Sequence, residues 1–185
     1  MAKLKVFNQV SLDGYFTDER NDMSWAHRSD PEWLAFTAEN ARAGATLVFG
    51  RVTYEMMAAY WPTPAARQAA PDVAAAMNRQ RKVVFSRTLK QAAWSNTTLV
   101  SEDPAIAVRA LKQRETHDLV VLGSGRIVAQ LAQAGLVDEF EIVVNPLVLG
   151  RGRSMFEGIE HRLKLELLKT RQFANGNMVL WYERA

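Results

Sequence analysis

The stretch HDLVVLGSGRIVAQLAQAG, residues 117–135, decides the fold class of this chain. Its apolar run 118–122 predicts a buried strand, and the amphipathic run 125–134 predicts a helix. Gly123-Ser124-Gly125-Arg126 stands between the two. Two interpretations of these glycines are open: they let a backbone close around a phosphate, or they only form a tight turn between strand and helix.

The same alternation of strand and helix extends over most of the chain. Apolar runs predict strands, and amphipathic runs that begin at Asp-Pro or end at Gly predict helices. After Gly135 the pattern changes to long strands, 137–150 and 163–173, and the turn ANGN leads into a last strand at 178–184. This order predicts a mixed sheet flanked by helices, with an antiparallel C-terminal hairpin. The Pro/Ala-rich stretch 62–71 is expected to connect two elements at the surface.

Composition restricts the class of protein. The 185 residues suit one domain over 1–185, and the absence of cysteine excludes disulfides and thiolate catalysis. Three histidines, none four residues from another, make a metal site unexpected. The net charge of +3 comes without a polybasic run, so no nucleic-acid partner is expected. No segment resembles a signal peptide or a membrane span, so a cytoplasmic protein is expected.

Three strand ends combine into a candidate anion site. Gly50-Arg51 with Thr53, Ser86-Arg87, and the segment Gly123 to Ile127 each follow a predicted strand. In α/β sheets, ligands bind at the carboxyl ends of strands, where helix N-termini and arginines attract phosphates. Three such positions suit a dinucleotide with an extra ribose phosphate, NADP. A Rossmann fingerprint fits less well, because Val128 stands where its third glycine is expected.

Several of these motifs, taken together, resemble a known family. They are VSLDGYF (10–16), FGRVTYE (49–55), VFSR (84–87), the run 120–142 and NPLVLGRGRSMF (145–156). As a set they are similar to the dihydrofolate reductase-like superfamily. The similarity is greatest to the C-terminal reductase domain of the bifunctional riboflavin-biosynthesis deaminase/reductase, and it covers nearly the whole chain.

The resemblance implies a mostly parallel sheet of about eight strands, hydride transfer from NADPH, and a homodimer. By position, Gly50, Arg51 and Thr53 would lie at the phosphates, and Ser86 and Arg87 at the 2′-phosphate. The pyrophosphate would lie at Gly123, Ser124, Gly125, Arg126 and Ile127. Asn8, Gln9 and Phe16 would hold the nicotinamide.

The sequence leaves alternative roles open for the candidate residues around the substrate. Asp13 is the candidate catalytic acid, able to orient a substrate or relay a proton, or it only shapes an Asp-Gly turn. Trp25 either stacks on an aromatic substrate or packs at the rim of the core. Arg151 either binds an anionic substrate or lies in a solvated loop. The proton donor stays open among Asp13, His27 and water.

These observations predict an NADPH-dependent reductase acting on a C=N or C=O bond of a small heterocyclic or ribosyl substrate. Two alternatives remain. One is a non-catalytic NADP-binding module. The other is a true dihydrofolate reductase, although Asp30 and Glu32 match the substrate-binding acid of that enzyme poorly. No deaminase module is present in the sequence.

Overall fold

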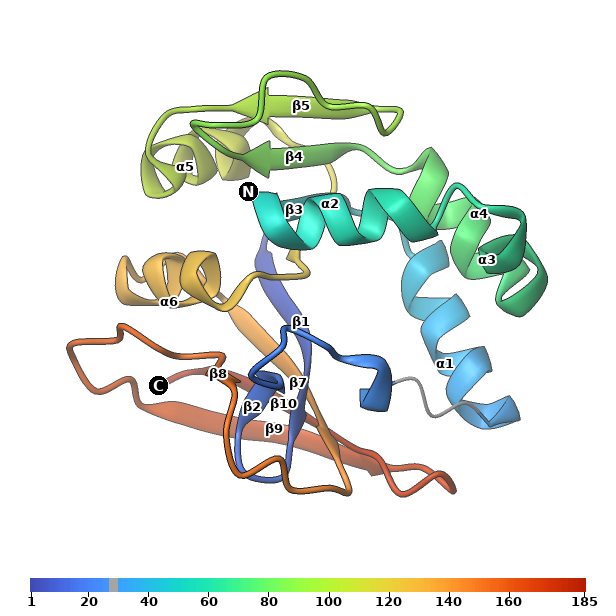
Figure 1. Ribbon diagram of the computed structural model, residues 1–185. Helices are drawn as coiled ribbons and strands as arrows, with labels where there is room; N and C mark the ends of the chain where they lie inside the picture. Colours follow the sequence, from blue (N-terminus) through green and yellow to red (C-terminus); the bar gives the residue numbers. More distant parts are fainter. Residues whose placement is uncertain (27–29) are drawn as a thin grey trace.

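The computed structural model describes residues 1–26 and 30–185, and it is built around one eight-stranded sheet (Figure 1). The strand order is β5-β4-β3-β6-β1-β7-β10-β9. The pairs from β5 to β7 are parallel, and β10 is antiparallel to both β7 and β9. The predicted fold class is therefore confirmed. The strands are β1 Leu4–Ser11, β3 Thr46–Gly50, β4 Lys82–Phe85, β5 Thr97–Val100, β6 Leu119–Val121, β7 Glu139–Asn145, β9 Leu165–Gln172 and β10 Met178–Arg184.

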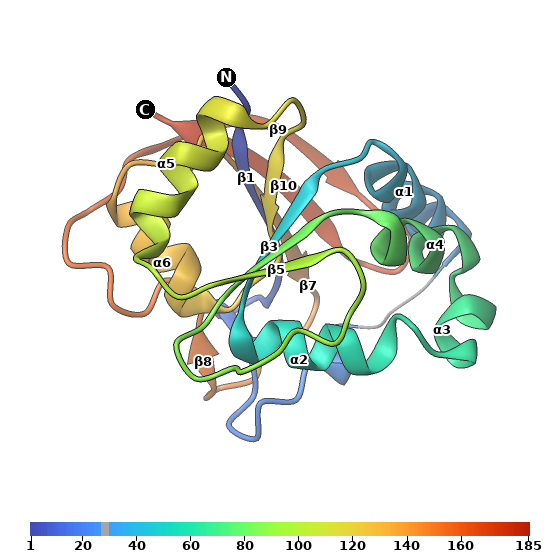
Figure 2. The ribbon, with the colours of Figure 1, turned by 90° about the horizontal axis from the view of Figure 1, so that it is seen from above.

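Helices cover both faces of this sheet (Figure 2). α5 and α6 pack on one face, and α1 and α4 lie on the other, because each helix buries an apolar side against the strands. A short 3-10 helix, η1 Ser24–Ala26, follows the short strand β2 Tyr15–Thr17. The α-helices are α1 Pro31–Arg42, α2 Arg51–Tyr60, α3 Pro64–Ala69, α4 Pro71–Arg79, α5 Pro104–Arg114 and α6 Gly125–Gln133. No described helix is long and apolar enough to span a membrane.

Two predicted segments differ from the observed ones. The stretch 62–71 contains the helix α3, which Thr63 caps by accepting a hydrogen bond from the backbone N–H of Ala66 at 3.2 Å. Thr63-Pro64 is the same N-cap and proline signal that starts other helices. The strand predicted over 137–150 ends at Asn145, because Pro146 has no N–H for a ladder.

A second, two-stranded sheet holds the β1–β2 turn against a late loop. β2 Tyr15–Thr17 pairs with β8 Arg153–Ser154, with Tyr15 opposite Ser154. Gly152, with φ +152°, lies so close to the Thr17 carbonyl that a Cβ there would clash. The GRGR segment is therefore fixed against the N-terminal hairpin.

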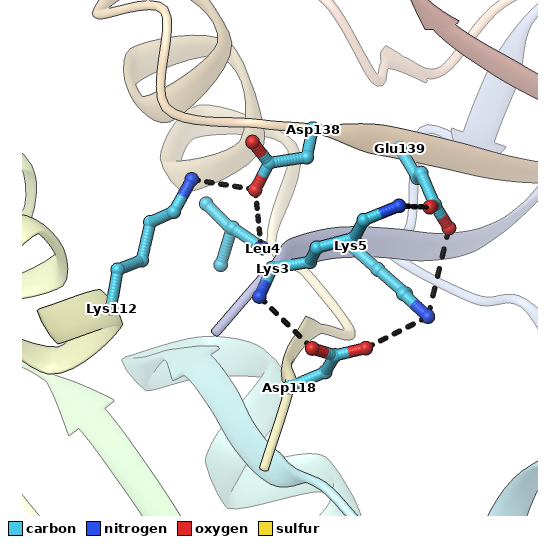
Figure 3. Close-up of polar contacts among 7 residues, drawn as sticks. All are labelled: Lys3, Leu4, Lys5, Lys112, Asp118, Asp138 and Glu139. Carbon is cyan, nitrogen blue, oxygen red and sulfur yellow. Dashed lines mark hydrogen bonds and ion pairs between the residues drawn. The ribbon is translucent and has the colours of Figure 1, made fainter. Parts of the chain in front are cut away.

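The amino ends of the central strands carry a network of ion pairs (Figure 3). Lys5 Nζ lies 2.9 Å from Asp118 Oδ2 and 3.6 Å from Glu139 Oε2, and Lys3 Nζ lies 2.5 Å from Glu139 Oε1. Hydrogen bonds to Glu139 and to Asp118 raise the pKa values of Lys3 and Lys5, respectively. At this end of the sheet, each of these two cations faces a carboxylate.

A second branch of the network reaches α5. The largely buried Lys112 donates to Asp138 Oδ2 at 2.5 Å and to the Leu136 carbonyl at 3.0 Å (Figure 3). The same carboxylate accepts the backbone N–H of Leu4 at 2.7 Å. These contacts tie α5, β1 and the start of β7 together at the amino ends of the strands.

Candidate active site

Two helix N-termini lie side by side where β3 and β6 end. The backbone N–H of Gly50 donates to the Gly123 carbonyl at 2.9 Å, so the starts of α2 and α6 are joined directly. Neither Gly50 nor Ser124, the residues before these helices, forms a side-chain cap. The side chains of Asp30, Thr63 and Asp103 cap α1, α3 and α5, whereas α4, which begins after Ala70, has no side-chain cap either. The first N–H groups of α2 and α6 are therefore left without a side-chain acceptor, as an anion site requires.

The glycines of this edge are required by packing within the protein. Gly123 has a φ of +118°, and a Cβ there would lie 3.0 Å from Thr53 Oγ1 and 3.5 Å from Asn8 Oδ1. A Cβ on Gly125 would lie 2.8 Å from Phe16 Cε1, and one on Gly50 would lie 2.9 Å from the Ser124 hydroxyl. Both glycines of the 123–125 segment are therefore needed to bring chain segments together. A phosphate is not required to explain them.

The same contacts show which predicted residues come together. Thr53 and Asn8 are buried at Gly123, and Phe16 covers Gly125. Gln9 alternates to the other face of β1, where its side-chain oxygen accepts from Asn145 Nδ2 at 3.4 Å. The two neighbouring β1 residues thus present their side chains to different sides of the sheet.

The arginines of the candidate anion site differ in their partners. Within residues 1–26 and 30–185, Arg87 and Arg126 are exposed and form no ion pair. Arg51 pairs with Glu55, one turn along α2, at 2.9 Å. Because two guanidinium groups at the carboxyl ends of β4 and β6 lack a carboxylate, this edge can attract an anion.

Ser86, which precedes Arg87 in the candidate anion site, forms hydrogen bonds within the turn after β4. Its hydroxyl accepts the backbone N–H groups of Thr88 at 3.1 Å and Leu89 at 2.9 Å. The turn holds Arg87 at the surface beyond β4. In this arrangement Ser86 shapes the loop, and its hydroxyl also lies 3.4 Å from the Thr88 hydroxyl.

Asp13 joins the β1–β2 turn to the loop after β7. Its carboxylate accepts the Ser11 hydroxyl at 2.6 Å and the backbone N–H groups of Gly150 at 2.7 Å and Leu149 at 3.1 Å. The hydrogen bond from Ser11, followed by those from Gly150 and Leu149, lowers the pKa of Asp13 below its ordinary value. The carboxylate is therefore ionised at neutral pH. This geometry favours a role in orientation over proton donation.

The candidate substrate residues lie on the segments that flank this edge. Trp25 is half-buried in η1, where its indole N–H donates to the Asp22 carbonyl at 3.1 Å. Arg151 has an 80% exposed side chain and lies 3.5 Å from Glu19. His27, the other candidate proton donor, lies outside the described residues.

The acids of α1 already have structural partners. Asp30 accepts the N–H of Trp33 at 2.9 Å, as the sequence predicts for an N-cap, and that of Asn175 at 3.2 Å. Glu32 lies 2.9 Å from Arg171 on β9. Both carboxylates therefore already have a structural role within the described residues.

Sequence reasoning missed two buried amides at the carboxyl end of β7. Asn145 and Asn177 are fully buried. The antiparallel register that places Met178 opposite Val144 brings Asn177 opposite Asn145 at the next position. Asn145 Oδ1 and both polar side-chain atoms of Asn177 have no hydrogen-bond partner among the described residues. The sequence offers no signal for this, because Asn177 belongs to a motif that reads as a turn.

Comparison with known proteins agrees with this architecture. Residues 2–179 match the family model described as the RibD C-terminal domain. YyaP from Bacillus subtilis (strain 168), described as an uncharacterized protein, is 27% identical over 177 residues, which are 94% of this chain and 90% of YyaP.

Two solved structures share the fold. A Shewanella sp. PV-4 protein with a proposed role in riboflavin biosynthesis has a TM-score of 0.76 and 23% identity, over 100% of this chain and 99% of its own. Dihydrofolate reductase from Enterococcus faecalis, solved with NADP(H), has a TM-score of 0.66 and 18% identity, over 98% and 96%. Since the family model matches nearly the whole sequence, the chain belongs to the RibD C-terminal domain family.

Proposed function

We propose that this protein is an NADPH-dependent reductase that transfers a hydride to a C=N or C=O bond of a small heterocyclic or ribosyl substrate. The observation that carries the proposal is the pair of adjacent, uncapped helix N-termini beside two arginines without a carboxylate. Membership of a reductase domain family, and a fold shared with an enzyme that was solved with NADP(H), support it.

The fit of NADPH follows from the chemistry of the donors. The N–H groups at the starts of α2 and α6, with Arg51, Thr53 and the segment Gly123 to Ile127, would hold the pyrophosphate. Ser86 and Arg87 would hold the 2′-phosphate. Asn8, Gln9 and Phe16 would lie at the nicotinamide, the asparagine and glutamine through backbone groups of β1. When bound, NADPH supplies the hydride, and the protein supplies binding and orientation.

Asp13 would contribute by position. Its ionised carboxylate fixes the loop that begins at Pro146 against the end of β1, and this contact shapes the edge where a substrate would enter. The proton that completes the reduction would come from water or from His27. Trp25 and Arg151 would lie at the rim of the substrate site.

Both alternatives have distinct observable consequences. A non-catalytic NADP-binding module would bind NADPH and never oxidise it with any substrate. A true dihydrofolate reductase would need a carboxylate for the pteridine, but Asp30 and Glu32 already have other partners, so the reductase of the riboflavin type is favoured.

The cofactor proposal is tested by isothermal titration calorimetry, which measures the affinity of the purified protein for NADPH and for NADH. Arg87→Ala should weaken NADPH binding by about tenfold, the equivalent of about 1.4 kcal/mol for a lost charge-assisted hydrogen bond, and should leave NADH unchanged. Arg109→Ala removes another exposed arginine, from α5, and should change neither affinity. If Arg87→Ala weakens the binding of NADPH and of NADH equally, the assignment of Arg87 to the 2′-phosphate is contradicted.

We also propose a homodimer formed through β9. This edge strand is exposed along its whole length, and Leu165, Leu167 and Leu168 are 37%, 51% and 50% exposed. An uncovered edge strand that exposes leucines can pair with the same strand of a second chain. Light scattering should give twice the chain mass, and Leu167→Lys should yield the monomer. A monomeric wild-type protein would rule out this dimer.

A further inference from the structure

The edge strand β9 carries its charges in a self-complementary order. It is the last strand of the eight-stranded sheet, and all eight of its residues are exposed (Figure 1). Its acidic residue, Glu166, lies near one end, and its basic residues, Lys169 and Arg171, lie toward the other. Charges of a single sign would keep a second strand away from such an edge. With both signs present, an antiparallel second copy of β9 can place acidic against basic side chains.

The carboxylate of Glu166 extends a row of like charges in the single chain. Glu166 lies opposite Glu183 of β10, and Glu183 lies opposite Glu139 of β7. Lys3 and Lys5 pair with Glu139, but within residues 1–26 and 30–185 neither Glu166 nor Glu183 forms an ion pair. Carboxylates directly opposite each other on neighbouring strands repel. The outer end of this row therefore lacks a cation, which a partner at the open edge of β9 can supply.

The basic end of β9 has donors available for a partner. Lys169 Nζ lies 4.3 Å from the centre of the Trp181 ring and has no ion pair in the described part of the chain. Arg171 lies 2.9 Å from Glu32, but a guanidinium carries five N–H donors, so it can bind a second carboxylate. Both cations line a cavity of about 360 Å³, which gives an incoming carboxylate room to approach.

A β-bulge shifts the alternation of side chains along β9. Lys169 lies opposite Trp181, whereas Leu167 lies opposite Tyr182, the next residue of β10. Leu168 is therefore an extra residue between them. Because successive residues of β10 point to opposite faces of the sheet, Lys169 and Leu167 do so as well. In an unbroken strand, two residues at this spacing would share a face.

The bulge restricts how two copies of β9 can pair. Glu166 lies opposite Glu183, which is two residues after the partner of Lys169 on β10. Glu166 therefore shares a face with Lys169 and Arg171. Side chains that meet across an antiparallel pair lie on one face of the sheet. A two-fold axis between Leu168 and Lys169 fulfils this condition, whereas an axis on either of these residues would place side chains of opposite faces against each other.

We propose that two copies of β9 pair antiparallel about this axis, so that Glu166 of each chain lies opposite Arg171 of the other. This inference rests on the proposed homodimer and adds its register. Leu167 of one copy would lie opposite Thr170 of the other. The two Glu166–Arg171 pairs supply the cation that the acidic row lacks in the single chain.

The pairing is tested by exchanging the charges. Glu166→Lys and Arg171→Glu each place like charges opposite each other twice, so each variant alone should weaken the dimer by about tenfold in analytical ultracentrifugation. An equimolar mixture of the two variants forms a heterodimer in which both pairs again have opposite charges, and it should recover most of the wild-type affinity. Glu102→Lys makes the same charge change at an exposed residue between β5 and α5 and should have no effect.

Cross-linking measures the register while Arg171 stays in place. The chain contains no cysteine, so Leu167→Cys and Thr170→Cys introduce the only thiols. A mixture of these two variants should form a disulfide-linked dimer with oxidised glutathione. Neither variant alone should do so, because in this register identical positions of the two chains lie about 10 Å apart along the strands.

Each contrary outcome has its own meaning. A monomeric wild-type protein would overturn the homodimer and this register with it. The register alone is overturned by a dimer that resists both charge changes, by a mixture as weak as each variant alone, or by cross-linking of a single variant. NADPH affinity is measured in each variant and should stay at the wild-type value, so the reductase proposal is tested separately.

Discussion

Lys82, at the start of β4, lies fully buried with no carboxylate within ion-pair distance among the described residues. Its ammonium donates to the carbonyls of Gln80 at 2.7 Å, Ser95 at 3.2 Å and Asn78 at 3.3 Å, and it lies 4.4 Å from the centre of the Trp94 ring. Burial lowers the pKa of Lys82 from 10.5 to about 8. The stability of the protein should therefore change with pH in the alkaline range.

The sign follows from proton binding. Between pH 8 and 10.5 the unfolded chain keeps this proton while the folded protein releases it, so the free energy of unfolding rises with pH. Each pKa unit is worth about 1.4 kcal/mol, so the whole difference is about 3 kcal/mol, and about 2 kcal/mol of it should be recovered between pH 7.5 and 9.5.

The assay is urea unfolding followed by tryptophan fluorescence at pH 7.5, 8.5 and 9.5. Lys82→Met lowers stability overall because three carbonyls lose a donor, but its stability should lack this rise with pH. Lys90→Met removes an exposed lysine and should keep the wild-type slope. The reasoning is refuted if wild type and Lys82→Met show the same dependence on pH.

Two further predictions concern the segments around the site. Gly125→Ala should lower the free energy of unfolding by about 1–3 kcal/mol, because the new Cβ meets Phe16 Cε1 at 2.8 Å and the Met155 carbonyl at 3.1 Å. Gly158→Ala, where φ is +89° and no atom lies within 4 Å, should cost only about 1–2 kcal/mol of backbone strain in the same urea assay, and a larger loss there than at Gly125 would contradict the packing argument. Asp13→Asn should speed amide hydrogen exchange at Leu149 and Gly150, measured by mass spectrometry, because an amide offers a single acceptor oxygen. In the wild type, the lowered pKa of Asp13 means that this protection is present above the ordinary carboxyl pKa and is lost as pH falls through the folded value; protection that survives at low pH would argue against the contact.

The parts of the fold that the sequence predicts are those with local causes. Asp30-Pro31 and Asp103-Pro104 start helices as expected, because the cap and the proline act within one turn. The C-terminal hairpin is recognisable from alternation and from the ANGN turn. The prediction that the Pro/Ala stretch only connects two elements was wrong, because it contains α3. The cap signal at Thr63 is followed by little apolar periodicity.

The parts that the sequence could not supply depend on distant residues. Which arginines lack a carboxylate is decided by side-chain pairs that form only in the folded chain. The sequence is compatible with Asp13 as a turn residue or as a catalytic acid. Its contacts with Leu149 and Gly150 form only when the loop after β7 folds against the β1–β2 turn. The sequence leaves open whether Gly123 and Gly125 bind a phosphate or form a turn, and only the folded chain shows that they also lie against Thr53 and Phe16.

The central claim is that the joined N-termini of α2 and α6 bind the pyrophosphate of NADPH. The most direct measurement is a titration of the 15N-labelled protein with NADPH, followed by the backbone amide resonances. We predict saturable shifts concentrated at residues 51–53 and 124–127, where the first N–H groups of these helices lie. Saturable binding with shifts confined to other regions, or no shifts at all, would contradict the account.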